Sequence, residues 1–170
     1  MMRLLVRLAA DPAGAAAAEM AMVTPLLILL MFGTFELGHF FLSEHVVQKS
    51  VRDAARYAAR LPLTKFPSCG DPSGEDLEKI QRVARTGHPD EGGAPQRLQG
   101  WTANGMTTVT VTPDTSGIYE GIYTDFPCPS GVPIVTVSAS VPYPTLFGAL
   151  GLGGPTLQLN AQSQTALFGA

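Results

Sequence analysis

A long uncharged stretch near the N-terminus constrains the fold more than any other feature of this sequence. No charged residue occurs in 20–35, and the apolar run covers 15–42 if Glu19 and Glu36 are accepted at its margins. A helix of about 20 residues is enough to cross the hydrocarbon core of a bilayer. We therefore interpret 15–42 as a membrane-spanning helix.

Two other interpretations of this stretch compete with a membrane span. A cleavable secretory signal would use Arg3 and Arg7 as its basic region, and a soluble protein could bury the stretch as a core helix. The signal fits poorly because a signal core has only about 7 to 15 apolar residues. In addition, no small-x-small cleavage site follows Phe41 before Glu44 and Lys49. The remaining alternative is a helix buried in the core of a soluble protein.

Length and charge limit the classes of function. With 170 residues the chain has room for one modest domain and an accessory segment, so a two-domain dehydrogenase or a barrel enzyme is excluded. Only 15% of the residues are charged, against about 25% in an ordinary soluble domain. Residues 98–170 contain no Lys or Arg. Because phosphate binding depends on clustered basic side chains, no nucleic-acid partner is expected.

The helical pattern continues beyond the apolar run. From Val47 to Leu61 apolar residues recur at three- and four-residue steps, which predicts an amphipathic extension of the same helix. We expect one helix over 15–61, ended by Pro62 because the residue before a proline disfavours helical geometry. Pro25, inside the apolar half, removes one backbone donor and predicts a local kink.

The remaining residues, 62–170, have the pattern of a small α+β domain. Ser73, with Asp76 three residues later, predicts the capped start of a second helix that stops at Gly87. Period-two alternation predicts strands at 107–112, 134–141 and 157–165, with a fourth at 117–123, in an antiparallel sheet of three to four strands. Residues 86–105 are expected to form a long loop, and the hydrophobic connection at 142–155 is either a flap on the core or a contact surface.

The two cysteines bear on the side of the membrane that the domain occupies. Cys69 and Cys128 are the only two in the chain. An even pair in an extracytoplasmic domain indicates a disulfide, whereas two buried thiols are the cytosolic alternative. A disulfide between Cys69 and Cys128 would lower the conformational entropy of the unfolded chain, which stabilises the fold by about 4 kcal/mol in the entropic model. We favour the disulfide.

A count of basic residues gives the opposite orientation. Lys49, Arg52, Arg56 and Arg60 follow the span, and the positive-inside rule taken alone would place the domain in the cytoplasm. These residues alternate with alanines in a continuing helical pattern. We therefore assign them to the face of a folded helix and place the domain outside.

The start of the apolar run carries an unusual acid. A short leader with two arginines ends at Gly14, and Glu19 follows five residues later. A carboxylate at the edge of a bilayer costs free energy unless it is paired. Cleavage after Gly14 would create an amine on Ala15 within one turn of Glu19, free to pair with that carboxylate or with Glu19 of a neighbouring subunit. Alternatively, Glu19 reaches the headgroup region alone and Gly14 is an ordinary loop residue.

The end of the apolar run contains two glycines and a second acid. Gly33 and Gly38 expose backbone for close helix packing, although their spacing of five differs from the usual four-residue motif. Glu36 marks either the outer membrane interface or a polar contact between subunits.

Enzyme signatures are missing from the sequence. The three histidines, His39, His45 and His88, do not have the spacing of a helical metal site. No nucleophile elbow, phosphate loop or dinucleotide fingerprint occurs. We expect no catalytic residues, no metal and no cofactor.

The N-terminal residues resemble a known family. The stretch GAAAAEMAMVTPLLILLMFGTFELG at 14–38, followed by VRDAARYAA at 51–59, closely resembles the TadE-like pseudopilins, or minor pilins, of tight-adherence (Flp-type) type IV pilus systems. The shared order is a glycine cleavage site, an acid, a Pro-Leu-rich span, a Phe-Gly and Glu-Leu-Gly element, and an alanine- and arginine-rich helix end. The resemblance covers about 13–59.

The resemblance implies a function and a set of partners. Residues 1–14 would be a leader, cut between Gly14 and Ala15 by a membrane prepilin peptidase, with Glu19 serving recognition or subunit registration. The protein would act in the bacterial inner membrane, or in a surface pilus, as a minor pilin or assembly factor. Its partners would be other pilins and the inner-membrane assembly platform. The alternative is an uncleaved, membrane-anchored extracytoplasmic binding domain.

Overall fold

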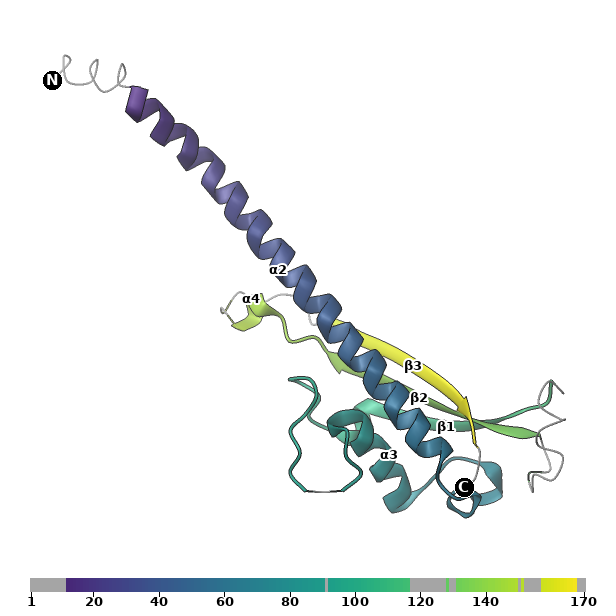
Figure 1. Cartoon of the computed structure of the whole chain (residues 1–170). Helices are drawn as coiled ribbons and strands as arrows, with labels where there is room; N and C mark the ends of the chain where they lie inside the picture. The colour runs from purple at the N-terminus through teal and green to yellow at the C-terminus, as the bar shows by residue number, and fades with distance from the viewer. Residues whose placement is uncertain are drawn as a thin grey trace. The chain divides into compact units, whose positions relative to one another are not determined.

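A computed structural model describes residues 12–90, 92–116, 128, 131–149, 151 and 157–167 of the chain. Its main elements are α2 (Pro12–Ala59), α3 (Gly74–Thr86), β1 (Thr107–Asp114), β2 (Val132–Pro142), the short helix α4 (Leu146–Ala149) and β3 (Gln158–Ala166), shown in Figure 1. Three 3-10 turns complete the described elements: η1 (Leu63–Lys65), η2 (Pro67–Cys69) and η3 (Asn104–Met106). The predicted α+β class, with a long apolar helix, a second helix and an antiparallel sheet, is confirmed.

The chain divides into two units at the middle of α2. One unit is Met1–His39 and the other is Phe40–Ala170. The second half of α2 therefore belongs to the folded domain. The helix continues through Pro25 and ends at Ala59, and the amides of Arg60 and Leu61 then bond three residues back.

The sheet has the order β1-β2-β3, and both neighbouring pairs are antiparallel. Val109 of β1 lies opposite Val137 of β2, which lies opposite Ser163 of β3. The three predicted strands are confirmed: β1 and β2 extend one or two residues beyond the predicted ends, and β3 is shifted by one residue. The fourth strand predicted at 117–123 lies outside the described residues, as does most of the connection after α4.

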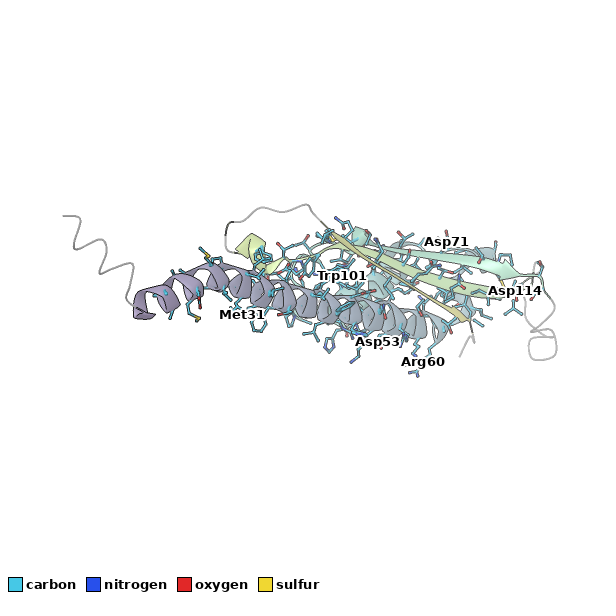
Figure 2. All side chains as sticks on the ribbon, turned by 90° about the horizontal axis from the view of Figure 1, so that it is seen from above. Met31, Asp53, Arg60, Asp71, Trp101 and Asp114 are labelled. Atoms are coloured by element: carbon cyan, nitrogen blue, oxygen red, sulfur yellow. A yellow bond between two sulfur atoms is a disulfide. The ribbon has the colours of Figure 1, made fainter. Side chains whose placement is uncertain are left out.

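One face of the sheet is covered by helices. The small residues Ala54 and Ala58 of α2 are fully buried and join Val135 and Val137 of β2 in the hydrophobic core. Figures 1 and 2 show the C-terminal half of α2 running along this face. Alanines on the contact face let the helix backbone approach the sheet closely. The other face carries exposed or half-exposed threonine, serine, asparagine and glutamine side chains on all three strands.

The second helix begins and ends where the sequence predicts, but its first turn is held differently. Ser73 is the N-cap residue, yet its side chain makes no capping hydrogen bond, so the predicted capping box is wrong. Asp76 instead forms an ion pair of 3.2 Å with Lys65, which precedes the helix. At the other end Gly87 adopts a left-handed conformation, and its amide bonds to the carbonyl of Val83 at 2.8 Å. Glycine takes this conformation without steric cost.

An ion pair on the exposed side of α3 follows the usual one-turn spacing. Lys79 lies 2.8 Å from the carboxylate of Glu75. This hydrogen bond lowers the pKa of Glu75 below its ordinary value and raises the pKa of Lys79 above its own. Both groups are at the surface, so we assign the pair a solvating role.

The segment after α3 is tied to α2 and closes the core. The guanidinium of Arg97 donates to the carboxylate of Asp53 at 2.8 Å and to the hydroxyl of Ser50 at 3.3 Å. Trp101, a few residues later, is completely buried and is the largest side chain in the core. Figure 2 shows it between α2 and the sheet. The region predicted as a long loop therefore supplies the centre of the core.

The disulfide predicted between Cys69 and Cys128 is present, with 5.7 Å between the two Cα atoms. It joins turn η2 to the segment before β2. We expect the Cys69→Ser/Cys128→Ser variant to lose about 2–4 kcal/mol of unfolding free energy, because the unfolded chain regains the entropy of the open loop. Urea denaturation of the full chain in detergent, followed by circular dichroism, measures the loss. Wild type with reductant should match the variant, and a midpoint unchanged in both would refute the prediction.

Candidate functional site

The first half of α2 presents an apolar surface that no described part of the chain covers. Met22, Leu29 and Phe35 are 81%, 69% and 61% exposed. An exposed apolar surface of this extent marks contact with a membrane or with other proteins. Of the helices described, α2 is the one long and apolar enough to cross a membrane. The structure thus supports a membrane anchor.

The two threonine hydroxyls within this half form hydrogen bonds inside the helix, as a bilayer requires. The hydroxyl of Thr24 donates to the carbonyl of Met20 at 2.6 Å, and that of Thr34 donates to the carbonyl of Met31 at 2.8 Å. A helix also pairs its backbone groups internally, which makes it one of the two structures that can cross lipid. Thr24 and Thr34 are therefore compatible with a buried position in hydrocarbon.

The residues of the expected cleavage site lie in the first turns of α2. Gly14 and Ala15 are exposed and helical, and Pro12 is the first residue of the helix. Ala15 and Glu19 are four residues apart and therefore share one face, one turn apart. No described residue pairs with the carboxylate of Glu19, which is also exposed. Among the described residues, this acid is thus left available to a partner.

The glycines of the span are not required by packing within the chain. A Cβ atom added to Gly33 or to Gly38 would meet nothing within 4 Å. Space beside these two positions is open to another helix. Glu36, between them, is half-exposed and precedes Ser43 by two helical turns.

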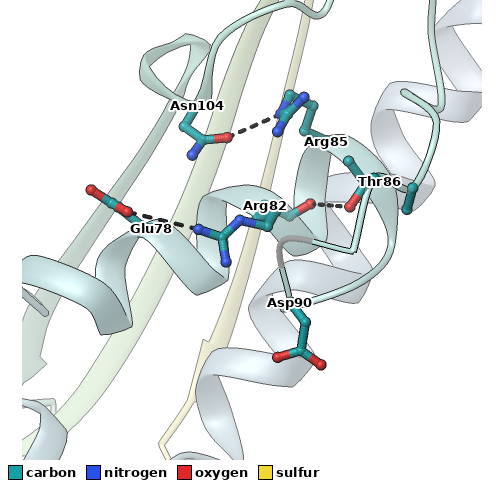
Figure 3. Close-up of a pocket in the computed structure, with 8 residues that line it drawn as sticks. Glu78, Arg82, Arg85, Thr86, Asp90 and Asn104 are labelled. Atoms are coloured by element: carbon teal, nitrogen blue, oxygen red, sulfur yellow. Dashed lines mark hydrogen bonds and ion pairs between the residues drawn. The ribbon is translucent and has the colours of Figure 1, made fainter.

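A polar hollow of about 440 Å³ lies beside α3. Figure 3 shows Arg82 and Arg85 at its wall. Arg82 is 7% exposed, donates to the carbonyl of Pro89 and lies 3.7 Å from Glu78. Arg85 donates to the side chain of Asn104 at 3.0 Å. Both guanidinium groups therefore hold neighbouring loops in place, and we assign the hollow a structural role.

Among the described residues no group of three or more His, Cys, Asp or Glu side chains is placed to hold a metal ion. The buried Arg82 and the link from Arg97 to α2 are two polar features of the described residues that the sequence did not indicate. The partners of Arg97 on α2 are more than 40 residues away in sequence, so this link has no local signal.

The fold and the exposed span define a class of protein: a small α+β domain carried on a single helix that can anchor it in a membrane. The family model of TadE-like proteins matches residues 14–56, about a quarter of the chain. This match confirms the resemblance to TadE-like proteins and supports a protein related to the tight-adherence pilus. The comparisons with curated proteins and with solved structures gave no match.

Proposed function

We propose that the chain is a prepilin-type TadE-like protein of a tight-adherence pilus. A membrane prepilin peptidase cuts it between Gly14 and Ala15, and the mature protein acts as a minor pilin or assembly factor. The observation that carries the proposal is the family match, which begins at Gly14 and includes Glu19. The exposed apolar half of α2 supports it, because this surface can contact lipid before assembly and the helices of other pilins after assembly.

The proposed role of Glu19 follows from its position. Cleavage would place a charged amine on Ala15, one turn from the carboxylate of Glu19. In hydrocarbon both charges need partners. Within one subunit they neutralise each other, and between subunits the same pair sets the register of two packed helices. Gly33 and Gly38 leave room for the neighbouring helix.

The proposed partners follow from this assembly. They are the prepilin peptidase, other pilins or pseudopilins and the inner-membrane assembly platform. The alternative, an uncleaved anchored binding domain, shares the membrane helix but keeps its leader. N-terminal mass spectrometry of the protein from cells with and without the peptidase separates the two, because only the proposed function produces a chain that begins at Ala15.

The proposed location of the domain is extracytoplasmic, on the outer side of the bacterial inner membrane. In spheroplasts, we expect a membrane-impermeant maleimide to label the protein only after an impermeant reductant has opened the disulfide between Cys69 and Cys128. The Cys69→Ser/Cys128→Ser variant is the control for unspecific labelling. Labelling that requires membrane lysis would place the domain in the cytoplasm. Labelling of intact spheroplasts without reductant would mean that the thiols are free.

A further inference from the structure

A row of four basic side chains along the C-terminal end of α2 and the turn after it has no role in the fold described above. Lys49, Arg52 and Arg56 lie on the helix, and Arg60 lies in the turn that follows it. Steps of three and four residues place all four on one side of the helix. All four are exposed, and Figure 2 shows Arg60 pointing away from the sheet. We call these four residues the basic row.

The other described basic residues are all engaged within the domain. Four form ion pairs and one donates to an amide side chain: Lys65 with Asp76, Lys79 with Glu75, Arg82 with Glu78, Arg97 with Asp53, and Arg85 with Asn104. The basic row, in contrast, makes no ion pair or side-chain hydrogen bond with any described residue. The chain has a net charge of −3, yet the cations left unpaired among the described residues lie together on one helix face. This concentration needs an explanation outside the domain.

The helix dipole explains only part of the row. Cations stabilise the carbonyl end of a helix, and the effect is confined to the last turn. Arg56 lies in the last turn of α2. Arg52 and Lys49 lie about one and two turns before Arg56, outside the last turn, so their position has another cause.

Lipid headgroups do not reach the whole row. At 1.5 Å per residue, Lys49 is about 10 Å along the helix from Leu42, the last residue of the apolar run, and Arg60 is about 27 Å away. The headgroup layer adds about 5–8 Å to each side of the hydrocarbon core. Screening limits the attraction to about another 8 Å at physiological salt. A helix that stands across the membrane therefore keeps Arg56 and Arg60 out of reach of the lipids.

We propose that the basic row binds a helix of a partner protein that presents carboxylates at matching three- and four-residue steps. Helices pack side by side at about 8–10 Å between axes, a distance that Lys and Arg side chains can bridge to a facing carboxylate. The row continues the helix that carries the span. A partner anchored in the same bilayer is already confined near the row, so its effective concentration there is high. This inference goes beyond the proposed function and does not require cleavage of the leader.

The test uses the full chain in phosphatidylcholine vesicles and a synthetic single-span peptide. The peptide continues beyond its span as a helix with four glutamates at the steps of the row, and energy transfer between fluorophores measures association. We expect Arg56→Gln/Arg60→Gln to weaken association about fivefold, because two exposed ion pairs are lost. Association of the wild type should also fall as salt is raised.

Three controls separate a specific contact from unspecific charge effects. Gln162→Glu/Gln164→Glu makes the same change in net charge on the exposed face of β3 and should associate like wild type. Arg56→Lys/Arg60→Lys keeps the charge and should retain association. A peptide with glutamine in place of glutamate should lose it. Circular dichroism confirms that each variant keeps its helix content.

The proposal is overturned if Arg56→Gln/Arg60→Gln associates as strongly as wild type, or if the glutamine peptide binds as well as the glutamate peptide. It is also overturned if association depends on adding phosphatidylglycerol to the vesicles, since that result would assign the basic row to anionic lipid.

Discussion

We expect a Glu19→Ala variant to insert into the membrane normally and to be lost from assembled pili. The substitution removes a carboxylate that, in the proposed assembly, neutralises the amine of Ala15 in a helix–helix contact. Leaving one member of such a desolvated pair alone costs about 2–5 kcal/mol, and 1.4 kcal/mol is a factor of ten. Incorporation, measured by immunoblot of sheared pili against the membrane fraction, should therefore fall by more than about tenfold.

Matched variants identify the property of Glu19 that matters. Glu19→Asp keeps the charge and should keep part of the incorporation, whereas Glu19→Gln keeps the shape and should behave like Glu19→Ala. Glu44→Ala, which removes an acid beyond the apolar run, serves as the control and should assemble like wild type. Normal incorporation of Glu19→Ala would contradict the registration role and favour the anchored binding domain.

We expect Trp101→Ala to destabilise the domain by about 3–5 kcal/mol, the usual cost of removing a large aromatic side chain from a core. Trp101 is completely buried among residues of α2, α3 and the sheet. A cavity at this position would remove contacts with several elements at once. Urea denaturation of the full chain in detergent, followed by circular dichroism, measures the change in unfolding free energy.

The indole nitrogen of Trp101 makes a second comparison informative. It has no hydrogen-bond partner among the described residues. Trp101→Phe removes this buried donor and keeps an aromatic ring, so its cost should be clearly smaller than that of Trp101→Ala. Leu157→Ala removes a side chain that is 47% exposed and should change stability little. Equal stability of Trp101→Ala and wild type would show that the residue is not a centre of the core.

Periodicity in the sequence was sufficient to predict most of the fold. The apolar run and the three- and four-residue steps after it predicted one continuous helix, and the alternation around Val109, Val137 and Leu159 predicted three strands. Each of these signals is local: it reflects one face of one element buried against something apolar. The left-handed stop at Gly87 is local in the same sense, because it depends on the backbone freedom of a single residue.

The features that were not predicted depend on partners distant in sequence. Trp101 lies in a segment rich in glycine and proline, and only the approach of α2 and the sheet buries it. Arg97 reaches Asp53 on α2 across 44 positions, and the carboxylate of Asp71 accepts the amide of Val111 on the edge strand β1. The one available signal for the burial of Trp101 was that it is a lone tryptophan within a polar loop. The candidate site was predicted by resemblance, and Glu19 needs a second molecule to show its role.

The central claim is cleavage between Gly14 and Ala15, and the most direct measurement is the mass of the N-terminal peptide. The protein is purified from cells with an active prepilin peptidase and from cells without it, digested, and analysed by mass spectrometry. We expect a peptide that begins at Ala15 in the first sample and an uncut leader in the second. A chain that retains residues 1–14 in both samples would contradict this claim.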